Sequence, residues 1–281
     1  MLNVLKALVI LFLLAAIGAG AAGAYYFLVE RPRRLDAAEL AHAPPAGQPT
    51  PDPSAPEFEK VCGLKRDLQF NEARDAVIAF LTRYPDSSHR QDAETLLGDL
   101  NVTELLSGRP GPDKVEYIVQ RGDVLDRVAH KTKSNTELIF QANSLDRIML
   151  RIGQKLEIPT VDFSLDVRLK NKKVLLLNHG RFFKSYVLLE ARPLGKKAAA
   201  IRTKVQEKIA FRDGKRVTFG SKEFPGSLRS VTLTGQPGYT LYAADVGNDS
   251  RAGTGLGLAA SDTEELHTLL NVGSPVSISA N

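Results

Sequence analysis

A run of apolar residues from Leu5 to Val29 is the feature that most limits what this chain can fold into. Lys6 is its only charged residue, and the run is longer than the roughly 20 residues that a helix needs to cross the hydrocarbon core of a bilayer. Tyr25 and Tyr26 lie near its end, where amphipathic rings favour the headgroup layer. We therefore predict a transmembrane signal-anchor over residues 1–30.

A cleaved signal peptide is the alternative for this segment. Small residues in "AGAAGA", residues 19–24, suit a signal peptidase. The apolar run continues through Phe27, Leu28 and Val29, which favours the uncleaved anchor. Arginines at 31, 33 and 34 follow it, and this bias alone would keep the C-terminal side in the cytoplasm.

The next segment, residues 31–57, is rich in proline and alanine and contains "HAPPAGQPTPDPSAP". Proline fixes φ and removes backbone donors, so we predict an extended linker without a core. Cys62 is the one cysteine of the chain, which excludes a disulfide framework and a multi-cysteine metal site within it. The net charge of +5 is typical of a mixed solvated surface and indicates no particular polyanion partner.

Residues 58–110 have the periodicity of helices. Apolar residues recur at helical spacing on both sides of "RYPDSSHRQDA", where Pro85 ends one helix and the following Asp and Ser residues offer caps for another. The segment resembles a single tetratricopeptide-type helical hairpin. Two interpretations stay open: a helical support that packs on its neighbour, and a groove for a protein partner.

Residues 114–160 are predicted to fold as strand, helix, helix, strand. "VEYIV" alternates like a strand, "RGD" turns the chain, and Asp123 is expected to cap a first helix. "SNTELIFQAN" gives a second helix, with Ser134 or Thr136 as its expected cap. "IGQKLEIP" turns at Gly153 and ends in a strand.

This segment resembles the lysin motif, LysM, through "YIVQRGDVL", "VAHKTKSNTELIFQAN" and "IGQKLEIP". The resemblance implies a βααβ fold that binds polymers containing N-acetylglucosamine, such as peptidoglycan and chitin, in a groove between two loops. Val124 and Asp126 depart from the family pattern. The implied glycan-binding residues are Gly122, Asp123, Val124 and Leu125 in the first loop, and Met149, Leu150, Arg151, Ile152 and Gly153 in the second.

Residues 164–281 are predicted to form a mostly-β domain. "VRLKNKKVLLLNHGRFFKSYVLL" has the turns of consecutive hairpins, and "RDGK" is a strong hairpin turn. "SDTEELHTLL" predicts one short helix, capped by Ser261 or Asp262, in which we expect His267 to be solvated. The fold class is therefore multidomain α+β.

The opening hairpins of this domain and the tail "ASDTEELHTLLNVGSPVSI" resemble the L,D-transpeptidase catalytic domain. That family uses a cysteine thiolate, activated by a histidine, to attack a peptide carbonyl in peptidoglycan. The resemblance places Gly255 at the cysteine and Gly253 at the histidine. Because glycine has no thiol, we predict no catalytic residue at this site.

These features predict a non-catalytic, membrane-anchored protein that binds peptidoglycan glycan strands of the bacterial envelope. Its C-terminal part is expected in the periplasm or extracytoplasmic space, although the arginines after the apolar run would by themselves favour the cytoplasm. Two alternatives stay open: a cell-wall enzyme with an unrecognised nucleophile, and an envelope scaffold that binds protein partners through the helical hairpin. The sequence indicates no cofactor, no metal site and no nucleic-acid partner.

Overall fold

The computed structural model describes residues 52–192, 201–235, 239–245 and 255–279. The predicted transmembrane segment and most of the predicted linker lie outside these residues. Among the helices that the structure describes, none has the length and apolar character of a membrane span. All elements below belong to one compact unit, Pro53–Asn281.

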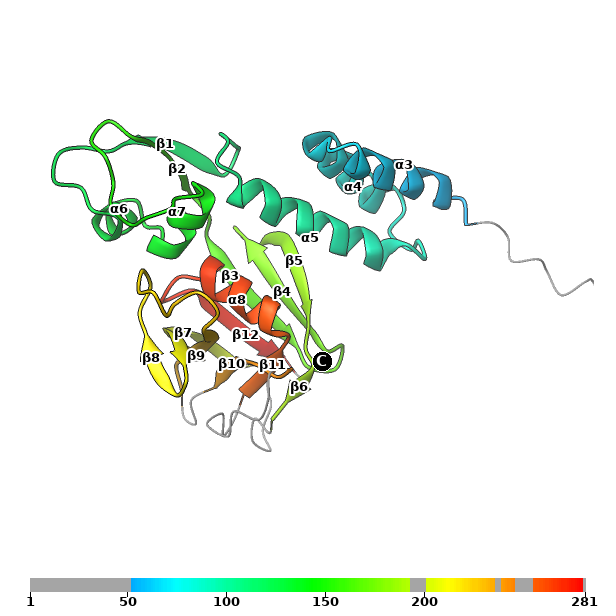
Figure 1. Cartoon of the computed structure of the whole chain (residues 1–281). Helices are drawn as coiled ribbons and strands as arrows, with labels where there is room; N and C mark the ends of the chain where they lie inside the picture. Colours follow the sequence, from blue (N-terminus) through cyan, green and yellow to red (C-terminus); the bar gives the residue numbers. More distant parts are fainter. Residues whose placement is uncertain (1–51, 193–200, 236–238, 246–254, 280–281) are drawn as a thin grey trace, which may run out of the picture. The chain divides into compact units, whose positions relative to one another are not determined.

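Three helices, where the sequence predicted two, begin this unit: α3 (Ala55–Arg66), α4 (Phe70–Arg83) and α5 (Arg90–Leu106) (Figure 1). Helix α3 starts inside the predicted linker, because Pro56 stands in its first turn, where proline's fixed φ and missing N–H are tolerated. The helices share a buried core of aliphatic side chains around the fully buried Phe80. Its buried members are Val61, Ala73, Val77, Phe80, Ala93, Leu96, Leu97 and Leu100.

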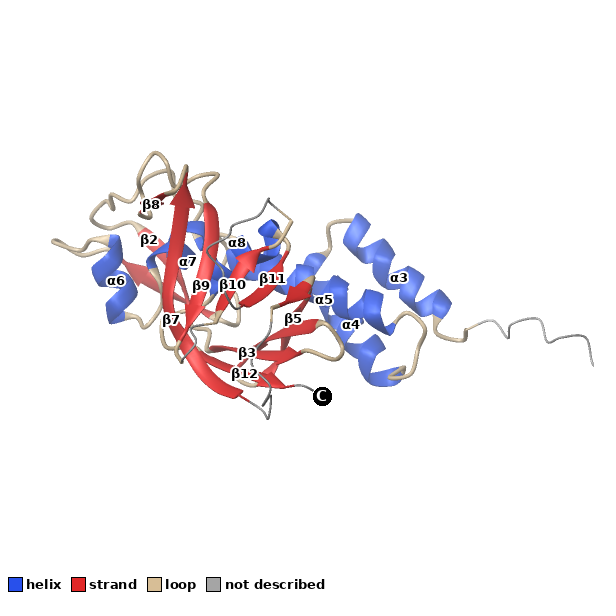
Figure 2. Cartoon of the chain, turned by 90° about the horizontal axis from the view of Figure 1, so that it is seen from below, coloured by secondary structure: helices blue, strands red, loops and turns tan. Residues whose placement is uncertain are grey.

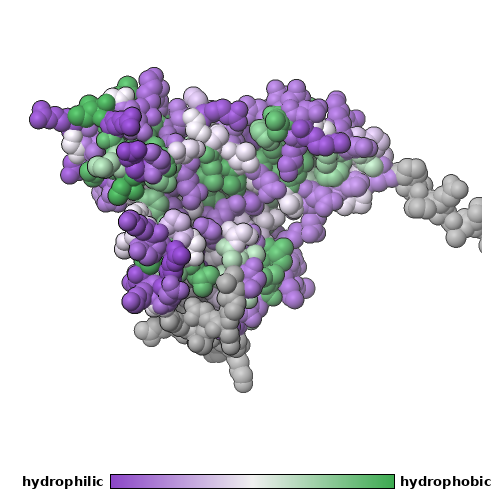
Figure 3. Space-filling model, viewed as in Figure 1, coloured by the Kyte–Doolittle hydropathy of each residue, from purple (hydrophilic) through white to green (hydrophobic). Residues whose placement is uncertain are grey.

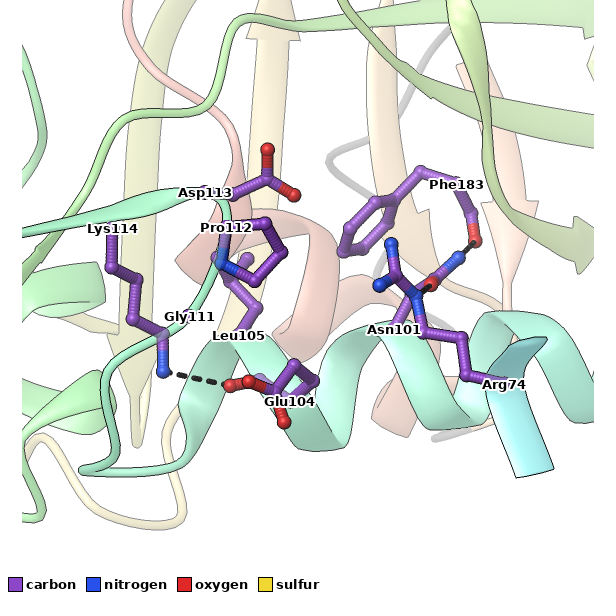
Figure 4. A pocket seen from close by; sticks show the side chains of 9 residues that line it. All are labelled: Arg74, Asn101, Glu104, Leu105, Gly111, Pro112, Asp113, Lys114 and Phe183. Atoms are coloured by element: carbon purple, nitrogen blue, oxygen red, sulfur yellow. Dashed lines mark hydrogen bonds between the residues drawn. The ribbon is translucent and has the colours of Figure 1, made fainter. Parts of the chain in front are cut away.

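Helix α5 joins these helices to the rest of the unit (Figure 4). The Lys114 ammonium donates to the carbonyls of Glu104 at 2.7 Å and Arg109 at 2.9 Å, and so satisfies main-chain acceptors at and beyond the end of α5. Near the middle of the helix, Asn101 Nδ2 donates to the Phe183 carbonyl at 2.8 Å. The helical segment therefore packs on its neighbours, as the first of its two interpretations predicts.

The predicted order of strand, helix, helix, strand is confirmed between residues 114 and 159. It consists of β1 (Lys114–Ile118), α6 (Leu125–Lys131), α7 (Thr136–Ala142) and β2 (Lys155–Pro159), with β1 antiparallel to β2. The expected caps are wrong: Asn135 caps α7 by accepting from Leu138 N at 2.8 Å, and Val124 stands at the N-cap of α6 without a side-chain cap bond.

The C-terminal part is built on a ten-stranded mixed sheet with the order β5-β4-β3-β12-β7-β9-β10-β11-β6, and β8 pairs β7 beside this path (Figure 2). Helix α8 (Ala260–Leu269) packs against β9 and β10. The described strands are β3 (Phe163–Arg168), β4 (Lys173–Asn178), β5 (Arg181–Val187), β6 (Glu190–Ala191), β7 (Ile201–Arg212), β8 (Lys215–Val217), β9 (Leu228–Leu233), β10 (Thr240–Ala243), β11 (Gly255–Leu258) and β12 (Pro275–Ser279).

Strand β7 carries two partners in succession on one of its edges. β12 pairs with Ile201–Lys204, and β8 pairs with Ala210–Arg212. The opposite edge is covered by β9 from Val205 to Phe211. Between the two partners, residues 206–209 therefore present an edge that no described strand covers.

The loop after β8 ties the sheet to the βααβ segment. Phe219 packs against the apolar core of that segment and makes an edge contact with Phe140, with ring centroids 5.3 Å apart. Phe224 extends this aromatic contact from the other side of Phe219 at 5.1 Å. The βααβ segment thus shares part of its apolar core with the sheet.

Candidate functional site

The two predicted glycan-binding loops lie at the same end of the β1–β2 pair, one after β1 and one before β2. Val119 N donates to the Gln154 carbonyl at 2.9 Å, and Gly153 N donates to the Val119 carbonyl at 2.8 Å. Gly122 and Gly153 have φ values of +87° and +81°, a region that glycine adopts without strain. The two loops are therefore held by backbone geometry that these glycines permit.

Apolar side chains on these loops stand in solvent. Met149 is 75% exposed, Ile152 70% and Val124 53%. Hydrophobic patches interrupt the polar surface around β1, β2 and α6, at the upper left of Figure 3. A pocket of about 490 Å³ lies at the second loop, lined by Leu145, Asp146, Arg147, Met149, Arg151, Ile152, Gly153 and Gln154. Exposed apolar side chains beside the charged and polar residues of this pocket form a surface suited to an amphipathic ligand.

Not every predicted residue reaches this surface. Leu125 is 2% exposed and belongs to the core of the βααβ segment, and the half-buried Leu150 packs against that core. The pocket also includes Leu145, Asp146, Arg147 and Gln154, which the sequence did not single out. Gln154 Oε1 accepts from Arg151 N at 3.1 Å and so shapes the second loop.

Asp123 shapes the first loop and does not cap α6. Its Oδ2 accepts from Gln120 N and from the Tyr117 hydroxyl, both at 2.8 Å. The Gln120 backbone hydrogen bond, followed by the Tyr117 bond, lowers the pKa of Asp123 below its usual range. The carboxylate thus stays ionised and holds the "RGD" turn against β1.

The position that the transpeptidase resemblance assigns to a cysteine is filled by neighbouring atoms. Gly255 is buried in β11, and a Cβ on it would lie 2.4 Å from the Thr240 carbonyl oxygen. A Cβ on Gly257, two residues along the same strand, would lie 2.6 Å from Glu190 Cγ. Real Cβ atoms do not approach backbone oxygen this closely, so glycine is required at Gly255. Gly253 lies outside the described residues.

The side chains of Tyr242 and Glu190 lie against these glycines. The Tyr242 hydroxyl bonds to Glu190 Oε1, and the Arg192 guanidinium lies 5.1 Å from the centre of the Tyr242 ring. Burial, with the hydrogen bond and charge of Glu190, raises the pKa of Tyr242 to about 12. The phenol of Tyr242 is therefore neutral and is not itself an activated nucleophile.

His267 was expected in solvent, and this expectation is wrong. Its side chain is buried in α8, and Nδ1 lies 2.8 Å from Glu137 Oε2 of α7. Thr268 Oγ1 donates to the other Glu137 oxygen at 3.0 Å, and Lys208 Nζ lies 3.9 Å from Oε2. A polar cluster therefore joins α7 of the βααβ segment to α8 and β7.

The pKa shifts in this cluster favour a neutral imidazole beside a carboxylate. Burial lowers the pKa of His267 and outweighs the attraction of Glu137. Burial would raise the pKa of Glu137, but the hydrogen bond from His267, with the charge of Lys208 and the hydrogen bond from Thr268, lowers it overall. Burial also lowers the pKa of Lys208 to about 8. His267 Nδ1–H therefore donates to the ionised Glu137.

No local sequence signal pointed to this cluster. Glu137 and His267 are 130 residues apart, and each occupies a helix position that alone reads as a solvated polar residue. The one available hint is that both residues belong to short amphipathic helices, whose apolar faces must pack against other elements. In the part of the chain that the structure describes, no group of three metal-ligating side chains is assembled.

The family model of the LysM domain matches residues 117–159 of this chain. These residues contain the end of β1, all of α6, α7 and β2, and both loops, so the chain contains a LysM domain at the position predicted from its sequence. No curated protein matches the chain.

Solved structures similar to this chain include L,D-transpeptidases. One is from Stackebrandtia nassauensis, with 17% identity and a TM-score of 0.30 over 43% of this chain and 56% of that one. Another is from Mycobacterium smegmatis, with 9% identity and a TM-score of 0.31 over 46% and 65%. A third, from Enterococcus faecium, has 13% identity and a TM-score of 0.30 over 73% and 82%. The matched region thus spans less than two thirds of the first two structures, and scores of this size assign no activity.

Proposed function

We propose that this chain is a non-catalytic peptidoglycan-binding protein of the bacterial envelope, tethered to the cytoplasmic membrane by its N-terminal segment. The LysM domain, with its exposed loop pair, is the observation that carries the proposal. The apolar run Leu5–Val29 supports the membrane tether. An extracytoplasmic location follows from the ligand, because peptidoglycan lies outside the cytoplasmic membrane.

The loop pair suits N-acetylglucosamine units for a physical reason. An acetamido group presents one N–H and one C=O, which main-chain groups of the loops can pair, and its methyl can pack against Met149 and Ile152. Burying one such apolar side chain contributes about 1–2 kcal/mol, so a single site binds weakly. A polymer with many repeats and a membrane tether raise the effective concentration.

The absence of catalysis is supported by the atoms around Gly255. A cysteine there would need a Cβ inside the contact distance of the Thr240 carbonyl, and the neighbouring Tyr242 is held as a neutral phenol by Glu190. An enzyme with another nucleophile would have to form an acyl adduct elsewhere. Intact-mass analysis of the full chain after incubation with stem tetrapeptide is expected to detect none.

Sedimentation with purified sacculi tests the proposal. The full chain in detergent should co-sediment, and Ile152→Asp should reduce retention by about tenfold, since it places a charge in the apolar part of the groove. Val115→Asp is the matched control, because Val115 is also an exposed apolar residue (51%) of the same domain and lies outside the loops. Equal retention of all three proteins would overturn the assignment of the groove.

A further inference from the structure

A pocket of about 520 Å³ lies on the sheet where β12 runs between β3 and β7 (Figure 2). This volume falls within the range of small-ligand sites. None of its lining residues belongs to the LysM domain, so the pocket is separate from the glycan groove. The lining residues are Ser164, Leu165, Leu177, Arg202, Thr203, Lys204, Thr234, Pro275, Val276 and Ser277.

The pocket opens on the face of the sheet that is turned away from the apolar core. Leu165 of β3 pairs with Val276 of β12, and both side chains are 2% exposed in that core. Because successive side chains of a strand point to opposite faces, the neighbouring Ser164 and Ser277 project from the other face. Arg202 of β7 stands opposite Ser277, so its side chain projects from this outer face as well.

Both charged residues that line the pocket are positive. Arg202 and Lys204 lie two positions apart on β7, so they project from the same face with their Cα atoms about 7 Å apart. Both are exposed, and neither forms an ion pair or a side-chain hydrogen bond with another residue of the described ranges. Two positive charges and no carboxylate in the lining give a sum of +2, which attracts an anion.

One carboxylate lies in the same row of the sheet, on the other side of Ser277, and it does not cancel this charge. Asp166 pairs with Ser277 in the strand register. Its Oδ2 accepts from Arg168 Nε at 3.0 Å, and its Oδ1 accepts from Ser277 Oγ at 3.1 Å. Both oxygens of Asp166 are engaged and Arg168 balances its charge, so Arg202 and Lys204 remain available to a ligand.

The two cations suit a phosphate group better than a carboxylate. A guanidinium offers five N–H groups and an ammonium three, whereas a carboxylate accepts about four hydrogen bonds. A phosphate monoester has up to two negative charges and three terminal oxygens, so it can meet both Arg202 and Lys204. The planar guanidinium also binds phosphate through two parallel hydrogen bonds.

The rest of the pocket suits a polyhydroxylated group attached to that phosphate. Four hydroxyls line it, of which Thr203 Oγ1 and Thr234 Oγ1 lie 2.9 Å apart as a hydrogen-bonded pair. In the part of the chain that the structure describes, the Ser164 hydroxyl has no hydrogen bond, so it can bind a ligand hydroxyl. Leu177, opposite Ser164 on β4, adds an apolar contact for the carbon skeleton.

We propose that this pocket binds a phosphate ester of a small polyol or sugar, with the phosphate between Arg202 and Lys204 and the polyol over Ser164. A lipid headgroup is a poorer match, because two cations attract an anionic membrane only weakly. In addition, none of the large apolar side chains that the structure shows in solvent lines the pocket. The inference does not rest on the proposed function, since it shares no residue with the glycan groove.

Amide chemical-shift titration of the full chain in a phosphate-free detergent, at constant ionic strength, tests this inference. Glycerol 3-phosphate should shift the amides of Ser164, Arg202, Lys204 and Ser277 saturably. Inorganic phosphate should bind more weakly, because it lacks the polyol, and glycerol alone should cause no shift. Binding of glycerol 3-phosphate no tighter than that of acetate would overturn the phosphate site, and binding no tighter than that of inorganic phosphate would overturn the polyol part.

Charge removal at the pocket provides the matched variants. Arg202→Gln and Lys204→Gln should each weaken glycerol 3-phosphate binding about fivefold, and the double variant should abolish the saturable shifts. Both residues are exposed, so neither substitution removes a core contact. Lys215→Gln, at an exposed lysine of β8 outside the pocket lining, is the control and should bind like the wild type. An equal loss in this control would mean that the ester binds through net charge alone and would overturn the site.

Nanodiscs distinguish a soluble ester from a lipid headgroup. The resonances of Arg202 and Lys204 should be the same in the full chain embedded in phosphatidylcholine or in phosphatidylglycerol. A shift in phosphatidylglycerol that matches the shift caused by glycerol 3-phosphate would assign the pocket to the membrane and overturn the soluble ligand. Failure of the glycan groove would leave these results unchanged, because the N-acetylglucosamine tetramer is expected to leave the resonances of this pocket unaltered.

Discussion

The LysM loop pair has exposed side chains and open space for a ligand, whereas strand β11 has neither. Met149 and Ile152 stand 75% and 70% exposed around a pocket, whereas the four residues of β11 are buried. Both regions resemble parts of cell-wall proteins in sequence, yet only the loops present surface to a polymer. A sequence resemblance to a family therefore supports a function only where the structure also leaves exposed side chains and open space for a ligand.

The largest expected effect on stability comes from adding a methyl group to the closely packed strand β11. Gly255→Ala should lower the free energy of unfolding by about 2–3 kcal/mol, because its Cβ would overlap the Thr240 carbonyl oxygen. Gly63→Ala is the matched control in α3, where nothing lies within 4 Å, and it should stabilise the protein by about 0.5–1 kcal/mol. Urea unfolding of both variants measures the difference, and a neutral Gly255→Ala would contradict the account of β11.

The next effect concerns the polar cluster that joins α7 of the LysM domain to α8 and β7. The imidazole of His267 is faced by Glu137 of α7, Lys208 of β7 and Arg229 of β9. Its lowered pKa means that the unfolded chain binds this proton first as pH falls, so its contribution to stability is fully present above about pH 6.5 and is lost below it. The lowered pKa of Glu137 acts in the same direction, above about pH 4.5.

We therefore expect the midpoint of thermal unfolding to fall between about pH 7.5 and about pH 5. His267→Gln should weaken this dependence, because it removes the group that titrates first. His179→Gln, in an exposed hairpin turn, is the control and should behave like the wild type. A pH dependence that His267→Gln leaves unaltered would exclude His267 as its source.

A smaller effect is expected within the open region. Asp123→Ala removes the acceptor of Gln120 N and the Tyr117 hydroxyl, and should destabilise the protein by about 1 kcal/mol. It should also weaken sugar binding, because the first loop loses the carboxylate that holds its turn. Calorimetric titration with the N-acetylglucosamine tetramer measures this change. Asp126→Ala, on the exposed side of α6, provides the comparison.

Ile152→Asp is expected to have the largest effect on binding and the smallest effect on stability. Ile152→Asp should change the free energy of unfolding by less than about 0.5 kcal/mol, because an exposed side chain contributes little to the core. A large destabilisation would mean that Ile152 is part of the fold, and its loss of sacculus binding would then carry no information on the groove.

Local sequence patterns predicted many of the helices and strands but few of the contacts between them. The strand–helix–helix–strand order follows from alternation, turns and helical spacing within 50 residues, and the loop glycines Gly122 and Gly153 could be identified there. The contacts of Lys114 with α5 and of Glu137 with His267 depend on packing between elements. No periodicity encodes such packing, and a histidine on a short helix reads as solvated until its neighbours are known.

The cap of α7 illustrates the same limit on a smaller scale. Ser134, Asn135 and Thr136 are all acceptable caps by type, and Asn135 serves because its Nδ2 also donates to the Thr268 carbonyl at 3.0 Å. The choice among three chemically suitable residues was made by a partner 133 positions away. For Gly255, in contrast, residue type alone excluded a thiol, and the structure adds the reason that none fits.

Amide chemical-shift mapping with the N-acetylglucosamine tetramer tests most directly whether the loops bind and β11 does not. In the full chain, the tetramer should shift the amides of the two loops, Gly122–Val124 and Met149–Gly153, and leave those of β11 unchanged. Shifts confined to β11, or none in either loop at saturating sugar, would contradict the assignment of glycan binding to the LysM groove.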